Sequence, residues 1–153
     1  VKDILEAAKH APTARNMQEL EYRVITNKSL IDKCNSGIAA AVQAEGIPLK
    51  GPVGAKPNFF YNAPCVIVIL GPKDNPWAVV DAGLAAQNIM LYATSIDLGS
   101  VFIGMARFIE KDKDLVKTLH IPDDMTIMAT VICGYPAENP EPREKHLKAE
   151  FFK

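Results

Sequence analysis

The chain has 153 residues, of which 48% are hydrophobic and 23% charged, and this balance suits one globular domain over residues 1–153 with a substantial core. Its formal net charge of −1 gives no electrostatic basis for binding nucleic acid or an anionic membrane. The longest apolar run, from Cys65 to Leu70, is far shorter than the roughly 18–20 residues that span a bilayer. We therefore expect neither nucleic acid nor a membrane as a partner.

Cysteine usage indicates a reducing compartment. Cys34, Cys65 and Cys133 are odd in number, widely separated and without C-x-x-C spacing, and the last two lie in apolar runs. We expect buried, reduced thiols in a cytoplasmic protein, and no signal-peptide pattern is visible. Because the chain begins at Val1 rather than Met, the sequence leaves room for residues upstream.

The first predicted element is an amphipathic helix over residues 2–10, whose apolar positions recur at helical spacing. Pro12 breaks this helix and biases Ala11 toward an extended conformation. The following loop, up to Gln18, is dense in short polar side chains and backbone donors, which suit the edge of a planar polar ligand. An ordinary helix stop and turn is the alternative interpretation.

A strand is expected over residues 21–26, followed by a helix over residues 30–44 with Ser29 as its N-cap. Residues 46–64 then contain three Gly and four Pro, with three consecutive aromatic residues at 59–61. This segment is too aromatic for a flexible linker, so we expect a variable loop or lid packed on the body. Its aromatic side chains either stack on an aromatic substrate or fill the core.

The second half combines strongly apolar strands with one long helix. Cys65–Leu70 is mostly β-branched and is typical of a central strand covered on both faces. The helix over residues 78–96 is apolar nearly all round, which predicts burial in the core or at a subunit interface, and Asp97-Leu98-Gly99 has the pattern of a glycine C-cap. The remaining predictions are a short strand over 101–104, a charged helix over 111–120, a buried strand over 125–133 and a charged tail over 137–153.

This alternation of helices and strands predicts a layered α/β or α+β domain. No strand is followed by G-x-G-x-x-G or a P-loop, which argues against a dinucleotide-binding fingerprint and an ATPase. His10, His120 and His146 are far apart and have no H-x-x-x-H or nearby Cys pair, so we expect no metal site. A G-x-S-x-G elbow for nucleophilic hydrolysis is also missing.

Four segments carry recognisable motifs in a fixed order. Residues 11–18 (APTARNMQ) fit A-P-[ST]-x-x-N-x-Q, and residues 81–93 resemble D-x-[GA]-x-A-x-Q-N-L-x-L-x-A. Residues 98–104 are similar to L-G-x-[GS]-x-x-[IW]-G, and residues 125–136 resemble a core strand that ends in a G-[YF]-P turn. Together they resemble the nitroreductase family of FMN-dependent oxidoreductases over nearly the whole chain. The resemblance implies an α+β fold, a three-layer α/β/α arrangement with a mixed central sheet flanked by helices, in an intertwined homodimer.

The resemblance also implies FMN as the cofactor. The expected reaction is ping-pong, in which hydride from NADH or NADPH passes through the flavin to a nitroaromatic, quinone or similar acceptor. Such chemistry needs no acid–base dyad, so no catalytic side chain is assigned. The alternatives are a related reductive dehalogenase or flavin-fragmenting enzyme, and a flavin-binding or sensing module with little turnover.

The cofactor-binding residues that the resemblance implies are Pro12, Thr13, Ala14, Asn16, Gln18, Phe102, Ile103, Gly104, Arg107 and Arg143. The loop up to Gln18 would meet a flavin that is bound mainly by the other subunit, and the backbone at 103–104 would place an N–H near flavin N5. Arg143 and Arg107 are candidates for the FMN phosphate, although an ion pair with Glu110 is as good an account of Arg107. For Asp81, Gln87 and Asn88 on the long helix, we favour bonds to neighbouring backbone over contact with the cofactor.

Overall fold

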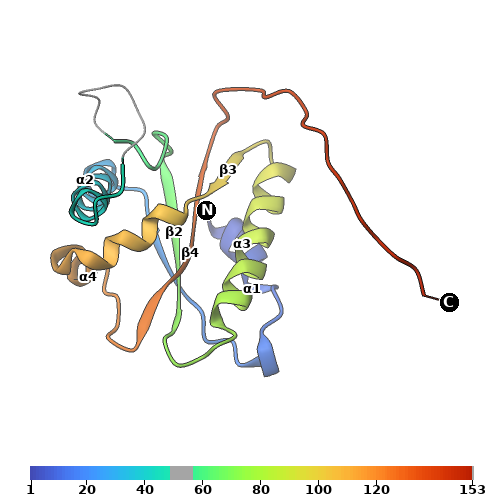
Figure 1. Ribbon diagram of the computed structural model, residues 1–153, viewed down its shortest axis with the longest axis horizontal. Coiled ribbons are helices and arrows are strands. Elements are labelled where there is room, and N and C mark those ends of the chain that lie inside the picture. Colours follow the sequence, from blue (N-terminus) through green and yellow to red (C-terminus); the bar gives the residue numbers. More distant parts are fainter. Residues whose placement is uncertain (49–56, 153) are drawn as a thin grey trace.

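A computed structural model describes residues 1–48 and 57–152 (Figure 1). With η denoting a 3-10 helix, its elements in chain order are α1 (Lys2–Lys9), η1 (Ala14–Asn16), β1 (Glu21–Ile25), α2 (Lys28–Ala44), β2 (Cys65–Pro72), α3 (Ala78–Ser95), β3 (Gly99–Phe102), η2 (Gly104–Lys111), α4 (Lys113–Thr118) and β4 (Met125–Gly134). Among these residues no helix combines the length and the apolar character that crossing a membrane requires.

The sheet has the strand order β1-β2-β4-β3, and every neighbouring pair is antiparallel. The mixed sheet expected from the sequence is therefore wrong for the described residues. β2, α3 and β3 do form a crossover whose two strands run in the same direction, as in a parallel βαβ unit. However, β4 inserts between these strands and runs against both of them, so no two parallel strands become neighbours.

Helices cover both faces of the sheet (Figure 1), as predicted. β2 alternates between the two sides, because successive side chains of a strand point to opposite faces. Val66, Val68 and Leu70 belong to the core that packs against α2, η2 and α4. Cys65, Ile67 and Ile69 belong to the second core, beneath α1 and α3. These two cores confirm the α+β class and the prediction of a central strand buried on both faces.

The N-cap of α2 is a different residue from the predicted one. Asn27, not Ser29, is the N-cap, because its Oδ1 accepts a hydrogen bond from the Leu30 amide at 3.0 Å. The Ser29 hydroxyl instead donates to the same Asn27 oxygen at 2.7 Å. The helix therefore begins at Lys28, two residues before the predicted start.

α3 buries only one of its apolar faces within this chain. The buried face is built mainly of alanine and consists of Ala78, Asp81, Ala82, Ala85, Ala86, Ile89 and Ala93. On the opposite face, Val79, Val80, Leu84 and Leu91 remain between 41% and 60% exposed. The helix ends through Asp97, which adopts a φ of 58° while the Leu98 amide donates to the Ala93 carbonyl at 2.9 Å. The predicted glycine C-cap is thus wrong, since Gly99 already opens β3.

The segment predicted as a lid lies partly outside the described residues, namely at 49–56. Of its aromatic residues, Phe60 is fully buried in the core under α2, and Phe59 packs beside it. Tyr61 is 70% exposed. Phe60 therefore fills the core, and the lid itself stays a prediction. Beyond β4, residues 137–152 are exposed, and Figure 1 shows this tail running away from the body.

Candidate functional site

The loop between α1 and β1 has a strained backbone. Arg15, Asn16 and Gln18 adopt positive φ angles of 53°, 56° and 56°. The left-handed conformation costs a residue with a Cβ about 1–2 kcal/mol. Three such residues within four positions persist only where surrounding contacts fix them, and such strain is concentrated at ligand-binding sites.

Hydrogen bonds inside the loop hold this conformation. The Gln18 amide donates to Thr13 Oγ1 at 3.1 Å, and the Asn16 amide donates to the Thr13 carbonyl at 3.0 Å. The side chains of Gln18 and Asn16 also bond to each other, with Gln18 Nε2 donating to Asn16 Oδ1 at 2.9 Å. Asn16 Nδ2 and Gln18 Oε1 take no part in that bond, so one donor and one acceptor remain at an exposed edge.

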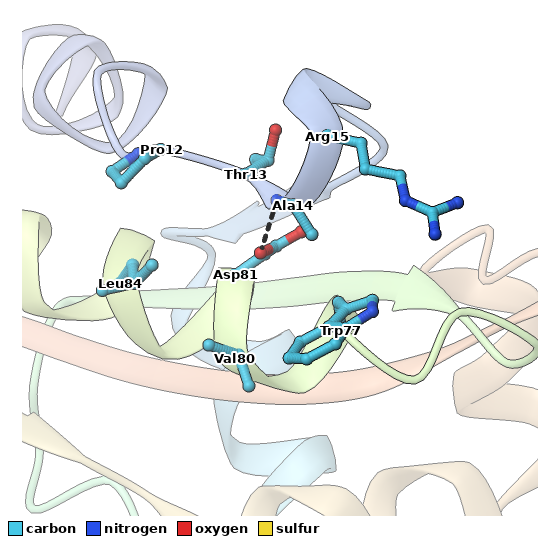
Figure 2. A pocket seen from close by; sticks show the side chains of 8 residues that line it. All are labelled: Pro12, Thr13, Ala14, Arg15, Trp77, Val80, Asp81 and Leu84. Carbon is cyan, nitrogen blue, oxygen red and sulfur yellow. Dashed lines mark hydrogen bonds between the residues drawn. The ribbon is translucent and has the colours of Figure 1, made fainter.

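A cavity of about 450 Å³ lies between this loop and the N-terminal half of α3 (Figure 2). It is lined by Pro12, Thr13, Ala14, Arg15, Trp77, Val80, Asp81 and Leu84. Apolar side chains from α3 and its N-cap form one wall, and the loop forms the other. This volume and this mixture of apolar walls with a few polar groups are typical of small-molecule sites.

The α3 wall contains residues that the sequence reasoning missed. Trp77, Val80 and Leu84 recur three and four positions apart, which places them on one face of the helix. The signal was present, because an apolar outer face on a helix whose inner face is also apolar calls for a second contact. The sequence alone does not show that this outer face of α3 meets the loop after α1, so the pattern could not locate the cavity.

Asp81 joins the two walls. Its Oδ1 accepts a hydrogen bond from the Ala14 amide at 3.0 Å, and the residue is only 5% exposed. Asn88, two turns further along α3, donates from Nδ2 to the Ala7 carbonyl at 3.1 Å. The expectation that these two residues satisfy neighbouring backbone is confirmed, whereas Gln87 is exposed.

The second group of predicted site residues lies where β3 leads into η2. The Ile103 amide donates to the Thr130 carbonyl at 2.9 Å, so it is not available to a ligand. Within residues 1–48 and 57–152, the Gly104 amide has no acceptor, as is usual in the first turn of a helix. A Cβ on Gly104 would meet nothing within 4 Å, so the space beside this N–H is open. Phe102, two residues earlier in the chain, is exposed.

The two candidate arginines are exposed and lie apart. The Arg107 guanidinium sits 5.1 Å from the centroid of the Phe108 ring. The alternative ion pair with Glu110 is wrong for the described residues, because Glu110 accepts from the Thr126 hydroxyl at 2.8 Å and the Ile127 amide at 2.9 Å. Arg143 lies in the exposed tail.

One chain does not bring these groups together. The loop bearing Asn16 packs with α1 and α3 over one face of the sheet, whereas Ile103 and the start of η2 pack into the core on the other face. In Figure 1 the loop lies at the N-terminal end of α3, far from the start of η2. In the part of the chain that the structure describes, no three His, Cys, Asp or Glu side chains are placed to hold a metal ion.

Comparison with known proteins gives the same family over most of the chain. The model of the nitroreductase family matches residues 1–135. A Methanothermobacter thermautotrophicus protein, provisionally named an NADH dehydrogenase/NAD(P)H nitroreductase, is 28% identical over 149 residues, which cover 94% of this chain and 69% of that protein.

Two solved structures show the same fold. An FMN-dependent nitroreductase from Clostridium difficile is 22% identical, with a TM-score of 0.83, over 99% of this chain and 86% of its own. A nitroreductase with bound FMN from Bacteroides fragilis is also 22% identical, with a TM-score of 0.78, over 97% and 82% of the two chains. With the family model spanning most of its length, this chain belongs to the nitroreductase family.

Proposed function

We propose that the chain is an FMN-dependent oxidoreductase that uses NADH or NADPH to reduce a nitroaromatic, quinone or similar small acceptor. The observation that carries this proposal is the cavity between α3 and the strained loop, which contains the family motif at residues 11–18. Bound FMN supplies the hydride chemistry, so the protein has to hold a planar ring, hydrogen-bond its polar edge and leave one face open.

The residues at the cavity fit such a group. Trp77, Val80 and Leu84 offer an apolar wall against which a flat ring system can pack. Asn16 and Gln18 lie further along the same loop, outside the cavity lining, and offer one amide donor and one acceptor at its exposed edge for ring or ribityl oxygens. These side chains bind and orient the cofactor, and none of them is required to move a proton.

The remaining contacts come from the opposite face of the sheet. The Gly104 amide, which has no acceptor among the described residues, would be a donor suited to flavin N5, and the exposed Phe102 side chain would be available to the ring. Arg107 and Arg143 supply positive charge for the phosphate. Because this group lies across the sheet from the loop of the same chain, we propose that each flavin site combines Gly104 of one subunit with the loop of its partner in a homodimer.

Steady-state kinetics test the reaction. The sequence contains no dinucleotide fingerprint that would make a separate nicotinamide pocket, so NAD(P)H and the acceptor are expected to use one flavin face in turn. Double-reciprocal plots with varied NAD(P)H should therefore give parallel lines at several concentrations of a quinone or nitroaromatic acceptor. Intersecting lines would indicate a ternary complex with separate pockets and would overturn the proposed mechanism.

Arg143→Ala tests the phosphate contact. A charge-assisted hydrogen bond contributes about 1.5–3 kcal/mol, so FMN affinity should fall roughly 10- to 100-fold, while turnover recovers at saturating FMN. Lys145→Ala is the matched control, because Lys145 is a basic residue of the same exposed tail. Equal losses in both variants would mean that the tail acts through its overall charge and that Arg143 makes no specific contact.

A further inference from the structure

Asp81 ties α3 to the loop that contains Asn16 and Gln18. We infer that Asp81 is a positioning residue for FMN, which fixes the Ala14 amide and thereby holds the left-handed loop in the conformation that accepts the cofactor. This inference rests on the proposed function of the same cavity. It gives a role to a charged side chain that the family chemistry leaves without one.

The burial of Asp81 needs an explanation. The side chain is 5% exposed, and no ion pair joins it to a cation within the described residues. Arg15 is the basic residue among those that line the cavity, and Figure 2 shows its side chain extending away from Asp81. A buried carboxylate without a cation is unfavourable unless it makes strong hydrogen bonds. Its bond to the Ala14 amide, at 3.0 Å, is the one that the described residues provide.

The hydrogen bond between Asp81 and Ala14 lies where it can fix the conformation of the whole loop. Ala14 is the first residue of η1, directly before the run of left-handed residues. The Met17 amide donates to the Ala14 carbonyl at 3.1 Å, and the Asn16 amide donates to the neighbouring Thr13 carbonyl at 3.0 Å. Fixing Ala14 therefore fixes the turn that orients Asn16. A charge-assisted hydrogen bond is about twice as strong as a neutral one. It can therefore offset part of the energetic cost of the left-handed residues in the loop.

Asp81 acts through Ala14 rather than by touching substrate. Its variants should therefore change cofactor affinity through the order of the loop, and the effect should depend on an oxygen acceptor at this position. Asp81→Ala removes the acceptor, whereas Asp81→Asn keeps an oxygen of the same reach. Asn88→Ala is the matched control, because Asn88 also ties α3 to the N-terminal segment, but through α1 instead of the loop.

The first measurement is FMN affinity of the purified full chain, titrated by quenching of flavin fluorescence. Asp81→Ala should bind FMN about tenfold or more weakly, the effect expected from losing a hydrogen bond to a charged group. Asp81→Asn should recover most of this loss, and Asn88→Ala should bind like the wild type even where its thermal midpoint falls as far as that of Asp81→Ala.

The second measurement does not use FMN. Hydrogen exchange at the Ala14 amide, followed in the cofactor-free protein, should be slow in the wild type and in Asn88→Ala, and markedly faster in Asp81→Ala. If Asp81→Ala does not fold, Asp81→Leu removes the acceptor and keeps an apolar side chain of similar shape at this buried position. Because it leaves no buried charge and no cavity, this variant should fold and still lose FMN affinity.

The outcomes separate the two levels of the proposal. A wild-type protein that does not bind FMN overturns the proposed function, and this inference with it. A wild type that binds FMN while Asp81→Ala or Asp81→Leu binds it equally well overturns the inference alone. The same holds if Asn88→Ala loses as much affinity as Asp81→Ala, because the effect would then follow general stability.

Discussion

At the scale of a single residue, the proposed contact between Asn16 and FMN can be tested by substitution. If its amide contacts FMN, Asn16→Ala should lower FMN affinity several-fold, since one hydrogen bond contributes about 0.5–1.5 kcal/mol. Alanine also strains the backbone at a φ of 56°, so Asn16→Gly is needed beside it, because glycine tolerates this conformation. Both variants should lose affinity in a direct titration. If Asn16→Gly binds FMN like the wild type, Asn16 serves only to shape the loop.

The cysteines give a prediction about pH. Burial raises the pKa of Cys34 and of Cys133 from an ordinary 9.0 to about 11, aided by the charge of Asp112 and by Cys65 respectively. The thiolate fraction at neutral pH is then about 100-fold lower, because each pKa unit is a factor of ten. Iodoacetamide should modify the native protein very slowly and the unfolded protein rapidly.

The same shift links the thiols to stability. The folded pKa lies above the unfolded value, so the contribution to stability is fully present below about pH 9 and is lost as the pH rises toward 11. Thermal midpoints measured across this range should fall with rising pH. A thiol that reacts rapidly in the native state at neutral pH would contradict the burial of these side chains.

Residue roles were predictable from the sequence where they depended on neighbours in the chain. Asp81 and Asn88 bond backbone groups, as expected for polar residues on a buried helix. The suggested Arg107–Glu110 pair is wrong because Glu110 is occupied by Thr126 and Ile127, which only the fold brings near. Local spacing cannot reveal a competing partner sixteen residues away.

At the scale of elements, strong patterns predicted structure and weak patterns did not. The β-branched run at Cys65 and the small-residue helix at Ala78 appear where predicted. The 3-10 helix η2 was missed, although Met105, Phe108 and Ile109 recur three and four positions apart, because the prediction began the next helix only at residue 111. Strand order was also beyond reach, because the insertion of β4 between β2 and β3 depends on contacts between distant segments.

Phe60 and Tyr61 test the assignment of the aromatic segment. Phe60 is fully buried in the core under α2, and its neighbour Tyr61 is 70% exposed. Phe60→Ala should lower the free energy of unfolding by about 3–5 kcal/mol, the cost of truncating a buried aromatic side chain. Tyr61→Ala should change it by less than about 0.5 kcal/mol. Similar losses from both variants in denaturant titrations would show that the segment packs differently.

At the scale of the whole molecule, the implied site is divided between two faces of the sheet. Val79, Val80, Leu84 and Leu91 on α3 are 41% to 60% exposed, and two of them also line the cavity, so this apolar face is a candidate for contact with a second copy. In the proposed homodimer, a second copy would cover this face and supply its Gly104 and Arg107 to the loop of the first. We therefore expect a dimer at micromolar concentration by sedimentation equilibrium. A stable monomer with FMN fully bound would contradict the shared site.

The central claim is that this chain holds FMN where NAD(P)H can reduce it. The most direct measurement is the visible absorption of the FMN-loaded protein, recorded without oxygen while NADH or NADPH is added. We predict that the oxidised flavin band bleaches at stoichiometric nicotinamide and returns when a quinone or nitroaromatic acceptor is added. If neither nicotinamide bleaches the loaded protein, the oxidoreductase function is wrong, and a flavin-binding module with little turnover becomes the better account of the cavity.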